Sequence, residues 1–497
     1  MSAAGSIRAL RAVALLACAT VLGAVSAAHA GDADPRLGEA RKLLEGPQEG
    51  TVRKGAHLCL EMNTAAAMEL LLDVLDRDHP HRRDIVWEVI PSFTDPYARE
   101  RVAAEMRKNR KNHRVRQWCA QALGLYGDAG FVGQLDKSLN DPRPFVQAAA
   151  AQALGRLRDP GPVEHLKRLA GDTDPFVREA VFEALVRIDP AAHAAWLEKG
   201  LADADAGVRC ALLGVVPELR PAETEERSRA ALADPDWRPR LQAVDNLVAA
   251  RTKTAVDALV GATGDARPVV AQRATAFLQR ISGKLFTLRE QWEGWWRESR
   301  EAFAFPEGDA AAPPPEAGHT RAAFNGLDVT SDHVAFVIDA SADMRLSTKA
   351  GKVKSVRARE ELDRTLTPLH GLLVFDVVTY GAELRTMAKA PVPLDEKSHK
   401  AALQFVDDAK LEGRKDIWAV LEAVVSDPDI DTVYLLSSGE PEVGLYVHWN
   451  RVTEHLRELN RFHKVVVHTV AYSNSTWYRD QMQKIAEATG GKFTFEE

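Results

Sequence analysis

A short apolar run in this chain is followed by side-chain oxygens at alternate positions. The run is residues 334–338, and Asp339, Ser341 and Asp343 come directly after it. Such a run without a polar break predicts a strand buried on both faces of a parallel sheet. Open α/β sheets bind ligands at the carboxyl ends of their strands. Two carboxylates and a hydroxyl at that edge are oxygen ligands of the kind that Mg²⁺ takes.

From residue 324 to the end of the chain, apolar runs alternate with helical patterns. This alternation predicts a doubly wound, parallel α/β sheet. We expect strands at 334–338, 372–378, 384–388, 431–436, 464–470 and 492–495. We expect helices at 353–369, 398–411, 417–425, 447–462 and 482–489.

Several segments of residues 324–497 carry a family resemblance. Asp376-Val-Val-Thr-Tyr-Gly381 matches a second-strand ending in which Phe is usual in place of Tyr380. Ile485-Ala486 and Thr489-Gly490-Gly491 match a closing helix and turn. With the order of elements, these segments resemble the von Willebrand factor A (vWA) domain. The resemblance implies a Rossmann-like fold and a metal site built from three loops.

This sequence departs from the metal-site pattern of that family. The family's first loop reads Asp-x-Ser-x-Ser; Asp339 and Ser341 match it, and Asp343 stands at the third position. The second loop has Gly-Gly-Thr-Asn/Asp-Ile, whereas residues 413–417 place Lys415 at the Thr position.

The third loop also departs from the pattern, because Ser438 stands where the family has Asp. Two of the five ligand positions are therefore kept. A lysine near Asp339 and Asp343 would be repelled by a divalent ion and attracted by the carboxylates. We therefore favour a Lys415–Asp339/Asp343 ion pair in place of the metal, with no cofactor.

The alternative is a distorted Mg²⁺ site. Asp339, Ser341 and Asp343 would then be the metal ligands, with Asp416 as a further one. Calorimetric titration with Mg²⁺ and Mn²⁺ distinguishes the two interpretations.

Residues 50 to 280 repeat with a period of 31. Segments that begin with Asp start at residues 141, 172, 203, 234 and 265. This period predicts a solenoid of helix pairs, in which Asp and Pro begin helices and stacking supplies the core. Val177-Arg178 and Val208-Arg209 keep the Asp-x-x-x-x-Val-Arg start of the short HEAT repeat, which this half of the chain resembles.

One position of the repeat is often arginine, namely Arg116, Arg178, Arg209 and Arg240. These residues form either a ridge for an acidic partner or a ladder with the aspartates between repeats, and we favour the ladder. Residues 286–303 predict a closing helix with Trp292, Trp295 and Trp296 on one face. We favour a cap of the core over a ligand platform.

The N-terminus predicts a signal peptide over residues 1–30. Arg8 and Arg11 precede an apolar stretch, and Ala28-His29-Ala30 fits the small-x-small cleavage rule. We therefore expect a secreted or periplasmic protein; a membrane anchor is the alternative. No later segment is apolar enough to span a membrane. The solenoid is then residues 31–304, a Pro/Ala-rich linker is 305–323, and the vWA-like domain is 324–497.

Composition and motifs exclude several functions. The net charge of -7 gives no electrostatic case for nucleic acid. Cys59, Cys119 and Cys210 have neither a disulfide framework nor metal-ligand spacing. Phosphate-binding loops, nucleophile elbows and zinc helices are absent from the sequence.

We expect a non-enzymatic extracytoplasmic scaffold that binds protein partners through both domains. The first alternative is a metal-dependent adhesion or assembly module with an atypical Mg²⁺ site. The second is an enzyme with its active site between the domains, which a buried polar pocket there would favour.

Overall fold

The computed structural model describes residues 34–77, 79–108, 111–306 and 322–496. The predicted signal peptide, residues 1–30, lies outside the described residues, as does most of the predicted linker at 305–323. The chain divides into two compact units, Met1–Ala184 and Leu185–Glu497. Among the described residues, no helix is both long and apolar enough to cross a membrane.

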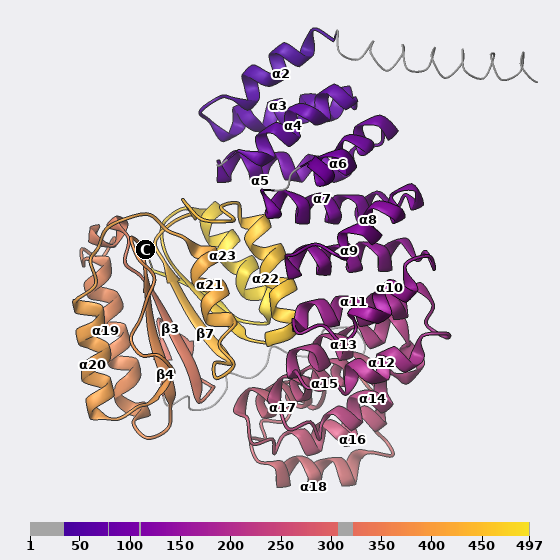
Figure 1. Ribbon diagram of the computed structural model, residues 1–497. Helices are drawn as coiled ribbons and strands as arrows, with labels where there is room; N and C mark the ends of the chain where they lie inside the picture. Colours follow the sequence, from indigo (N-terminus) through magenta and orange to yellow (C-terminus); the bar gives the residue numbers. More distant parts are fainter. Residues whose placement is uncertain (1–33, 78, 109–110, 307–321, 497) are drawn as a thin grey trace, which may run out of the picture. The chain divides into compact units, whose positions relative to one another are not determined.

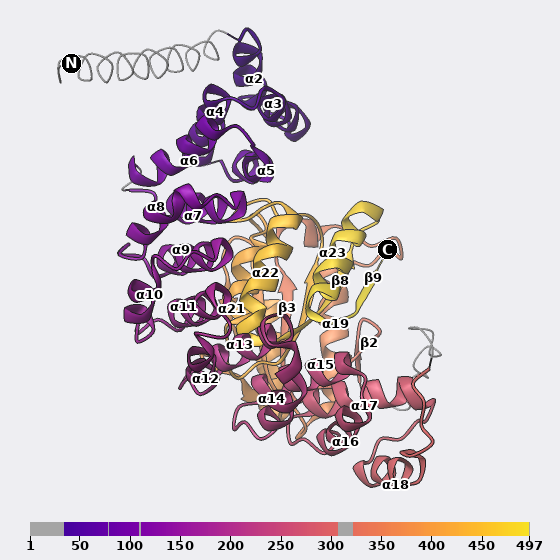
Figure 2. The same ribbon diagram turned by 90° about the vertical axis from the view of Figure 1, so that its right-hand side faces the viewer.

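The first unit is a stack of helices (Figure 1, Figure 2). Its helices are α2 (Arg36–Leu44), α3 (Glu49–Met62), α4 (Ala65–Asp76), α5 (Pro80–Val89), α6 (Pro96–Lys108), α7 (His113–Tyr126), α8 (Val132–Ser138), α9 (Pro144–Leu157), α10 (Val163–Leu169) and most of α11 (Pro175–Ile188). The second unit continues with α12 (Ala194–Leu201), α13 (Ala206–Leu219), α14 (Thr224–Ala231), α15 (Trp237–Ala250), α16 (Lys253–Ala262), α17 (Pro268–Ser282) and α18 (Arg289–Ser299).

The helix starts reproduce the period of the sequence. Helices α7, α9, α11, α13, α15 and α17 begin at residues 113, 144, 175, 206, 237 and 268, each 31 after the one before. The capping is as predicted: the Asp205 side chain accepts hydrogen bonds from the N–H groups of Gly207 and Val208, and Asp236 accepts one from Arg238. The predicted helix pairs are therefore confirmed.

Helix α18 closes the solenoid. Trp292 and Trp296 are buried in one cluster with apolar residues of α15, α16 and α17. The Trp296 indole donates a hydrogen bond of 2.6 Å to Asp257 Oδ1. The interpretation as a cap is confirmed, but the helix is shorter than the predicted 286–303. Phe286 and Phe303 lie beyond its ends and pack against the tryptophans, with ring centroids 5.2 Å from Trp292 and 5.3 Å from Trp296.

Residues 322–496, the sheet domain, contain a mixed sheet. Its parallel strands are β3 (His333–Asp339), β4 (Val374–Tyr380), β7 (Thr432–Ser437), β8 (Val466–Tyr472) and β9 (Phe493–Glu496). The short strands β5 (Arg385–Thr386) and β6 (Val392–Pro393) pair antiparallel with β4. The order is β5-β4-β3-β7-β8-β9, so the chain leaves β3 for one side of the sheet and later returns to its other side.

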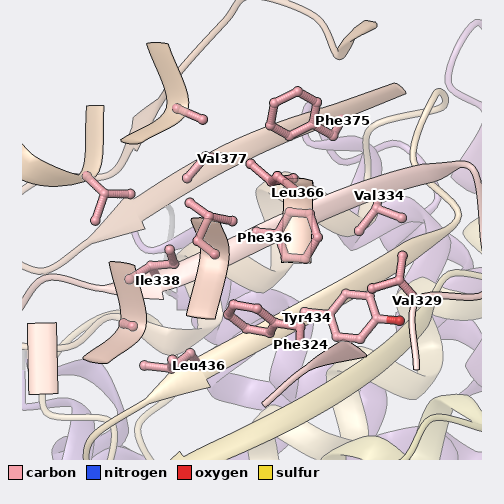
Figure 3. Packing of buried hydrophobic residues seen from close by; sticks show 14 of the residues in the cluster. Phe324, Val329, Val334, Phe336, Ile338, Leu366, Phe375, Val377, Tyr434 and Leu436 are labelled. Atoms are coloured by element: carbon pink, nitrogen blue, oxygen red, sulfur yellow. The ribbon is translucent and has the colours of Figure 1, made fainter. Parts of the chain in front are cut away.

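Helices cover the sheet on both faces (Figure 1). They are α19 (Lys354–Leu366), α20 (Glu396–Asp407), α21 (Ile417–Val425), α22 (Trp449–His463) and α23 (Thr476–Thr489). Figure 3 shows the core on the face of α19 and α20, where Phe336 stacks on Tyr434 with centroids 5.5 Å apart. Phe324, from the hairpin of β1 (Ala323–Phe324) and β2 (Leu327–Asp328), meets Phe336 edge-on at 5.2 Å.

Most predicted elements of the sheet domain are present within a few residues. Helix α21 has the predicted bounds, whereas α23 begins six residues before the predicted 482. The Ser475 side chain caps α23 by accepting a hydrogen bond from Tyr478 N–H. Tyr478 is fully buried. The first turn of α23 mixes polar and aromatic residues, so it lacks the apolar spacing from which a helix is predicted.

Within the second unit, helix α17 and the sheet domain share a buried ion pair. Arg267, which precedes α17, places its Nε 2.6 Å from Asp431 Oδ2. Asp431 is 0% exposed and lies directly before β7. Lys464 makes a second ion pair of 2.7 Å with Asp245 of α15. The last helices of the solenoid are therefore bound to the sheet domain by charge pairs.

His468 of β8 makes the stability of the sheet domain sensitive to acid. Burial lowers the pKa of His468 to about 4. Its Nδ1 accepts a hydrogen bond of 3.0 Å from Lys492 N–H. The folded pKa of His468 lies below its unfolded value, so the neutral ring stabilises the fold fully above about pH 6.5, and this stabilisation is lost as the pH falls toward 4. We expect the free energy of unfolding to fall by about 2 kcal/mol between pH 7 and pH 5 because of His468.

Urea unfolding of the wild type and of His468→Asn at pH 7 and pH 5 checks this expectation. The asparagine keeps an acceptor but does not titrate, so its loss at pH 5 should be smaller by about 2 kcal/mol. His463, whose pKa burial also lowers to about 4, supplies a remaining loss in both proteins. Equal losses in the two proteins would refute the assignment to His468.

Candidate functional site

The carboxyl ends of β3 and β7 meet at one edge of the sheet, because the two strands pair in parallel. Asp339, the last residue of β3, is 1% exposed. Its Oδ1 accepts a hydrogen bond of 2.7 Å from Ser341 N–H. Its Oδ2 accepts bonds of 2.8 Å from Ser438 N–H and 2.6 Å from Ser438 Oγ. The first and third predicted loops are thus joined by one buried carboxylate.

Lys415 of the second loop lies at the same edge. Its side chain is 3% exposed, and its Nζ is 2.7 Å from Asp343 Oδ2 and 2.9 Å from Glu442 Oε2. Burial disfavours the ammonium, but the hydrogen bonds to the two carboxylates and the charge of Asp339 outweigh it and raise the pKa of Lys415. Lys415 therefore carries its charge in the folded protein.

Lys415 forms an ion pair, as predicted, but its two acidic partners are Asp343 and Glu442 and not Asp339 and Asp343. Asp343 is a direct partner of Lys415, as predicted. Asp339 acts on Lys415 through its charge, and its oxygens bond Ser341 and Ser438 instead. Sequence reasoning missed Glu442. The only signal for it was an acid a few residues after the third loop, which the family pattern does not contain.

Residues 439–444 fold over Lys415. The N–H groups of Glu442 and Val443 donate to Lys415 O at 2.9 Å and 3.3 Å. Lys415 N–H donates in return to Glu442 Oε2 at 3.2 Å. A Cβ at Gly439 would lie 3.2 Å from Lys415 Cε. The backbone around the ammonium is therefore closely packed.

Two predicted site residues, Asp416 and Ser341, have no described hydrogen bond to the Lys415 ammonium. Asp416 is the N-cap of α21, and its Oδ1 accepts a hydrogen bond of 2.9 Å from Ala419 N–H. Burial raises the pKa of the Asp416 carboxyl. Ser341 is buried, and among the described residues its Oγ has no hydrogen-bond partner. Ser341 is thus the one predicted ligand whose hydroxyl is directed at no protein group within the described chain.

A second lysine adds positive charge to this edge. Burial lowers the pKa of Lys354, at the start of α19, while the charges of Asp343 and Asp339 oppose that shift and the charge of Lys415 adds to it. The edge thus combines two lysines with three carboxylates, those of Asp339, Asp343 and Glu442.

A small cavity lies beside Asp339. Its volume is about 110 Å³, and it is lined by Ile338, Val356, Val406 and Leu411, among other residues. Pockets for small-molecule substrates usually have volumes of about 300 Å³ or more. This cavity therefore gives no support to an enzyme that acts on such substrates at this edge.

The arginines of the repeat form a ladder where the structure shows their side-chain partners. Arg116, Arg209 and Arg240 each make a two-pronged ion pair with an aspartate of the next repeat. In each pair the aspartate follows the arginine by 25 residues. The interpretation as a structural ladder is confirmed for these three residues.

The cysteines are structural. Cys59, Cys119 and Cys210 are buried and free. Burial raises the pKa of all three thiols, which keeps them protonated and unreactive. The expected absence of a disulfide framework holds for these residues.

Comparison with known proteins supports the solenoid. A family model described as HEAT repeats matches residues 99–186 and 134–216. HEAT repeats are present in this chain. Such repeats commonly mediate protein–protein interactions. The match ends before the sheet domain. No curated protein matches the chain.

Solved structures resemble parts of the chain weakly. The complex of CpcE and CpcF of phycocyanin lyase from Nostoc sp. PCC7120 is 21% identical, covers 46% of this chain and 94% of that chain, and has a TM-score of 0.30. Human deoxyhypusine hydroxylase is 20% identical, with 52% and 98% covered and a TM-score of 0.23. Proximal thread matrix protein 1 from the mussel byssus is 16% identical, with 32% and 43% covered and a TM-score of 0.24. These low scores carry no argument about function.

Proposed function

We propose that this protein is a non-enzymatic, extracytoplasmic interaction scaffold. Its HEAT solenoid and a vWA-like sheet domain bind protein partners, and an ion pair centred on Lys415 replaces the metal ion of the vWA site. The N-terminal segment with the pattern of a signal peptide supports the location outside the cytoplasm.

The sheet supports the assignment to a doubly wound, Rossmann-like vWA fold. The strand order switches at β3: the strand that follows it in sequence, β4, lies on one side, and β7 lies on the other. Ligands of open α/β sheets bind at such a point, outside the carboxyl ends of the strands. Asp339 and Lys415 lie there.

The position of the Lys415 ammonium carries the proposal. It is buried and contacts Asp343, which stands at a metal-ligand position of the vWA pattern. At an effective dielectric constant of about 20, a divalent ion about 4 Å from an ammonium is repelled by about 8 kcal/mol. One carboxylate attracts the ammonium at the same distance by about 4 kcal/mol, because the ammonium carries a single charge. Asp343 and Glu442 therefore hold the ammonium in place, and the ammonium opposes Mg²⁺ at this position.

The buried ammonium changes what this edge of the sheet can present to a protein partner. A metal-loaded vWA site presents a cation, which suits an acidic residue of the partner. Here the cation is buried, and the half-exposed carboxylate of Asp343 faces outward instead. Partner binding would then depend on other contacts and would not respond to chelators.

One observation favours the alternative of a metal-dependent adhesion or assembly module. The buried Ser341 Oγ has no hydrogen-bond partner within the described chain, as expected for a hydroxyl that serves as a metal ligand. Asp339, Ser341 and Asp343 would hold Mg²⁺ in that case.

Calorimetric titration of the tag-free, chelator-treated chain distinguishes the two functions. We expect no binding of Mg²⁺ or Mn²⁺ with a Kd below about 1 mM, because the Lys415 ammonium opposes the ion. Ser341→Ala should behave like the wild type, since it removes a hydroxyl without breaking a described hydrogen bond. Micromolar binding that Ser341→Ala weakens would establish the metal-dependent module instead.

A further inference from the structure

Two histidines of the sheet domain lie next to each other, away from the Lys415 site. His370 comes shortly before β4, and His399 is in the first turn of α20. The distance from His370 Nε2 to His399 Nδ1 is 2.9 Å. The ring centroids are 5.1 Å apart, and the rings are nearly perpendicular, at 89°. Residues from two elements therefore bring one ring nitrogen each within hydrogen-bond distance of the other.

An aspartate lies behind one of these histidines. Asp363 Oδ1 of α19 is 2.9 Å from His399 Nε2, the ring nitrogen that faces away from His370. His399 Nε2 makes no hydrogen bond among the described residues, so Asp363 acts on it through its charge at this short distance. A negative charge there favours a proton on Nε2, which leaves Nδ1 as a ligand. Histidines that bind metals are usually held in this way.

The spacing of the two nitrogens suits a metal ion. Metal–imidazole bonds are about 2.05 Å long. Two nitrogens 2.9 Å apart then subtend roughly 90° at the metal. This is the angle between neighbouring ligands in square-planar and octahedral complexes, which Cu²⁺ and Ni²⁺ prefer. Tetrahedral Zn²⁺ would need a wider spacing.

We propose that His370 and His399 form a binding site for one divalent transition-metal ion, Ni²⁺ or Cu²⁺ in preference to Zn²⁺. His370 is exposed, so its ring can turn from the histidine partner toward the ion. Water completes the coordination. Glu396, three residues before His399 on α20, interacts electrostatically with His370 and adds negative charge. Neither histidine belongs to the vWA metal pattern.

A second cluster of histidine and carboxylate side chains involves the sheet domain, and its neighbouring groups disfavour a metal ion. Asp332, His333 and Asp431 have ligand atoms within 4.8 Å of one another. There Arg267 contacts Asp431 at 2.6 Å, and a guanidinium repels a metal ion. Thr432 Oγ1 also donates to Asp431. This cluster is a structural ion pair, whereas the described contacts of His370 and His399 place no cation between the two rings.

Titration calorimetry of the tag-free full chain with Ni²⁺ at pH 7.5 tests the proposal. We expect one ion per chain with micromolar affinity, and binding at least tenfold weaker in His370→Ala and in His399→Ala. Asp363→Asn should weaken binding about tenfold and leave one site. His165→Ala is the matched control, because His165 is also paired with an aspartate at 3.0 Å and is similarly buried, but the described contacts show no second histidine.

Two further arms make the result decisive. Asp339→Ala should leave Ni²⁺ binding unchanged, which separates this site from the Lys415 edge. Circular dichroism of each variant confirms that it is folded. Unchanged Ni²⁺ affinity in folded His370→Ala and His399→Ala would overturn the proposal, as would a wild type that binds no more tightly than either variant.

Discussion

Replacing Lys415 by Thr and Ser438 by Asp together should create a Mg²⁺ or Mn²⁺ site with micromolar affinity. The first change removes the ammonium that opposes a divalent ion. The second adds a carboxylate beside Asp339, whose Oδ2 now accepts a hydrogen bond of 2.6 Å from Ser438 Oγ. Two carboxylates at that distance repel each other until a cation joins them. The double variant should therefore be less stable without metal, and 5 mM Mg²⁺ should raise its Tm by several degrees.

Calorimetry and thermal unfolding with and without Mg²⁺ measure this effect. Lys352→Thr is the control, since Lys352 makes a half-exposed pair with Glu360 and should change neither quantity. Lys415→Thr alone should bind Mg²⁺ more weakly than the double variant, because the third loop then lacks its acid. A folded double variant that ignores Mg²⁺ would contradict the assignment of this edge to a vWA site whose metal a lysine has replaced.

Arg267→Ala should lower the free energy of unfolding of the second unit by about 3 kcal/mol. Asp431 is 0% exposed, and its Oδ1 accepts a hydrogen bond of 2.8 Å from Thr432 Oγ1. Burial raises the pKa of Asp431, and the charge of Arg267 opposes that shift. Without Arg267, a buried carboxylate is left with neutral partners only, which is costly.

Urea unfolding at pH 7 measures this loss. Arg300→Ala, at a half-exposed pair with Asp257, is the matched control and should cost much less, because solvent screens an exposed pair. Because the pKa of Asp431 is raised in the fold, protonation favours folding, and the deficit of Arg267→Ala should shrink as the pH falls toward 4. Asp431→Asn in the Arg267→Ala background should recover part of it. A deficit below 1 kcal/mol at pH 7 would show that the pair is not an important link.

The local features of this protein could be predicted from its sequence. The 31-residue period of Asp-led segments placed five helix starts, because Asp and Pro act on the backbone within one turn. Apolar runs placed β3 and β7 for a similar reason: a strand buried on both faces needs consecutive apolar residues. Asp343 and Lys415 were paired in advance because opposite charges at one sheet edge attract.

Only the tertiary structure decided which distant groups complete each site. Glu442 joins Lys415 across 27 residues, and Ser438 takes the carboxylate of Asp339 across 99. Likewise, His370 and His399 meet only because the segment before β4 packs beside α20. Periodicity reports what one turn or one strand requires of its own side chains. Which oxygen or nitrogen lies within 3 Å of another depends on the packing of whole elements, and that packing leaves no local pattern in the chain.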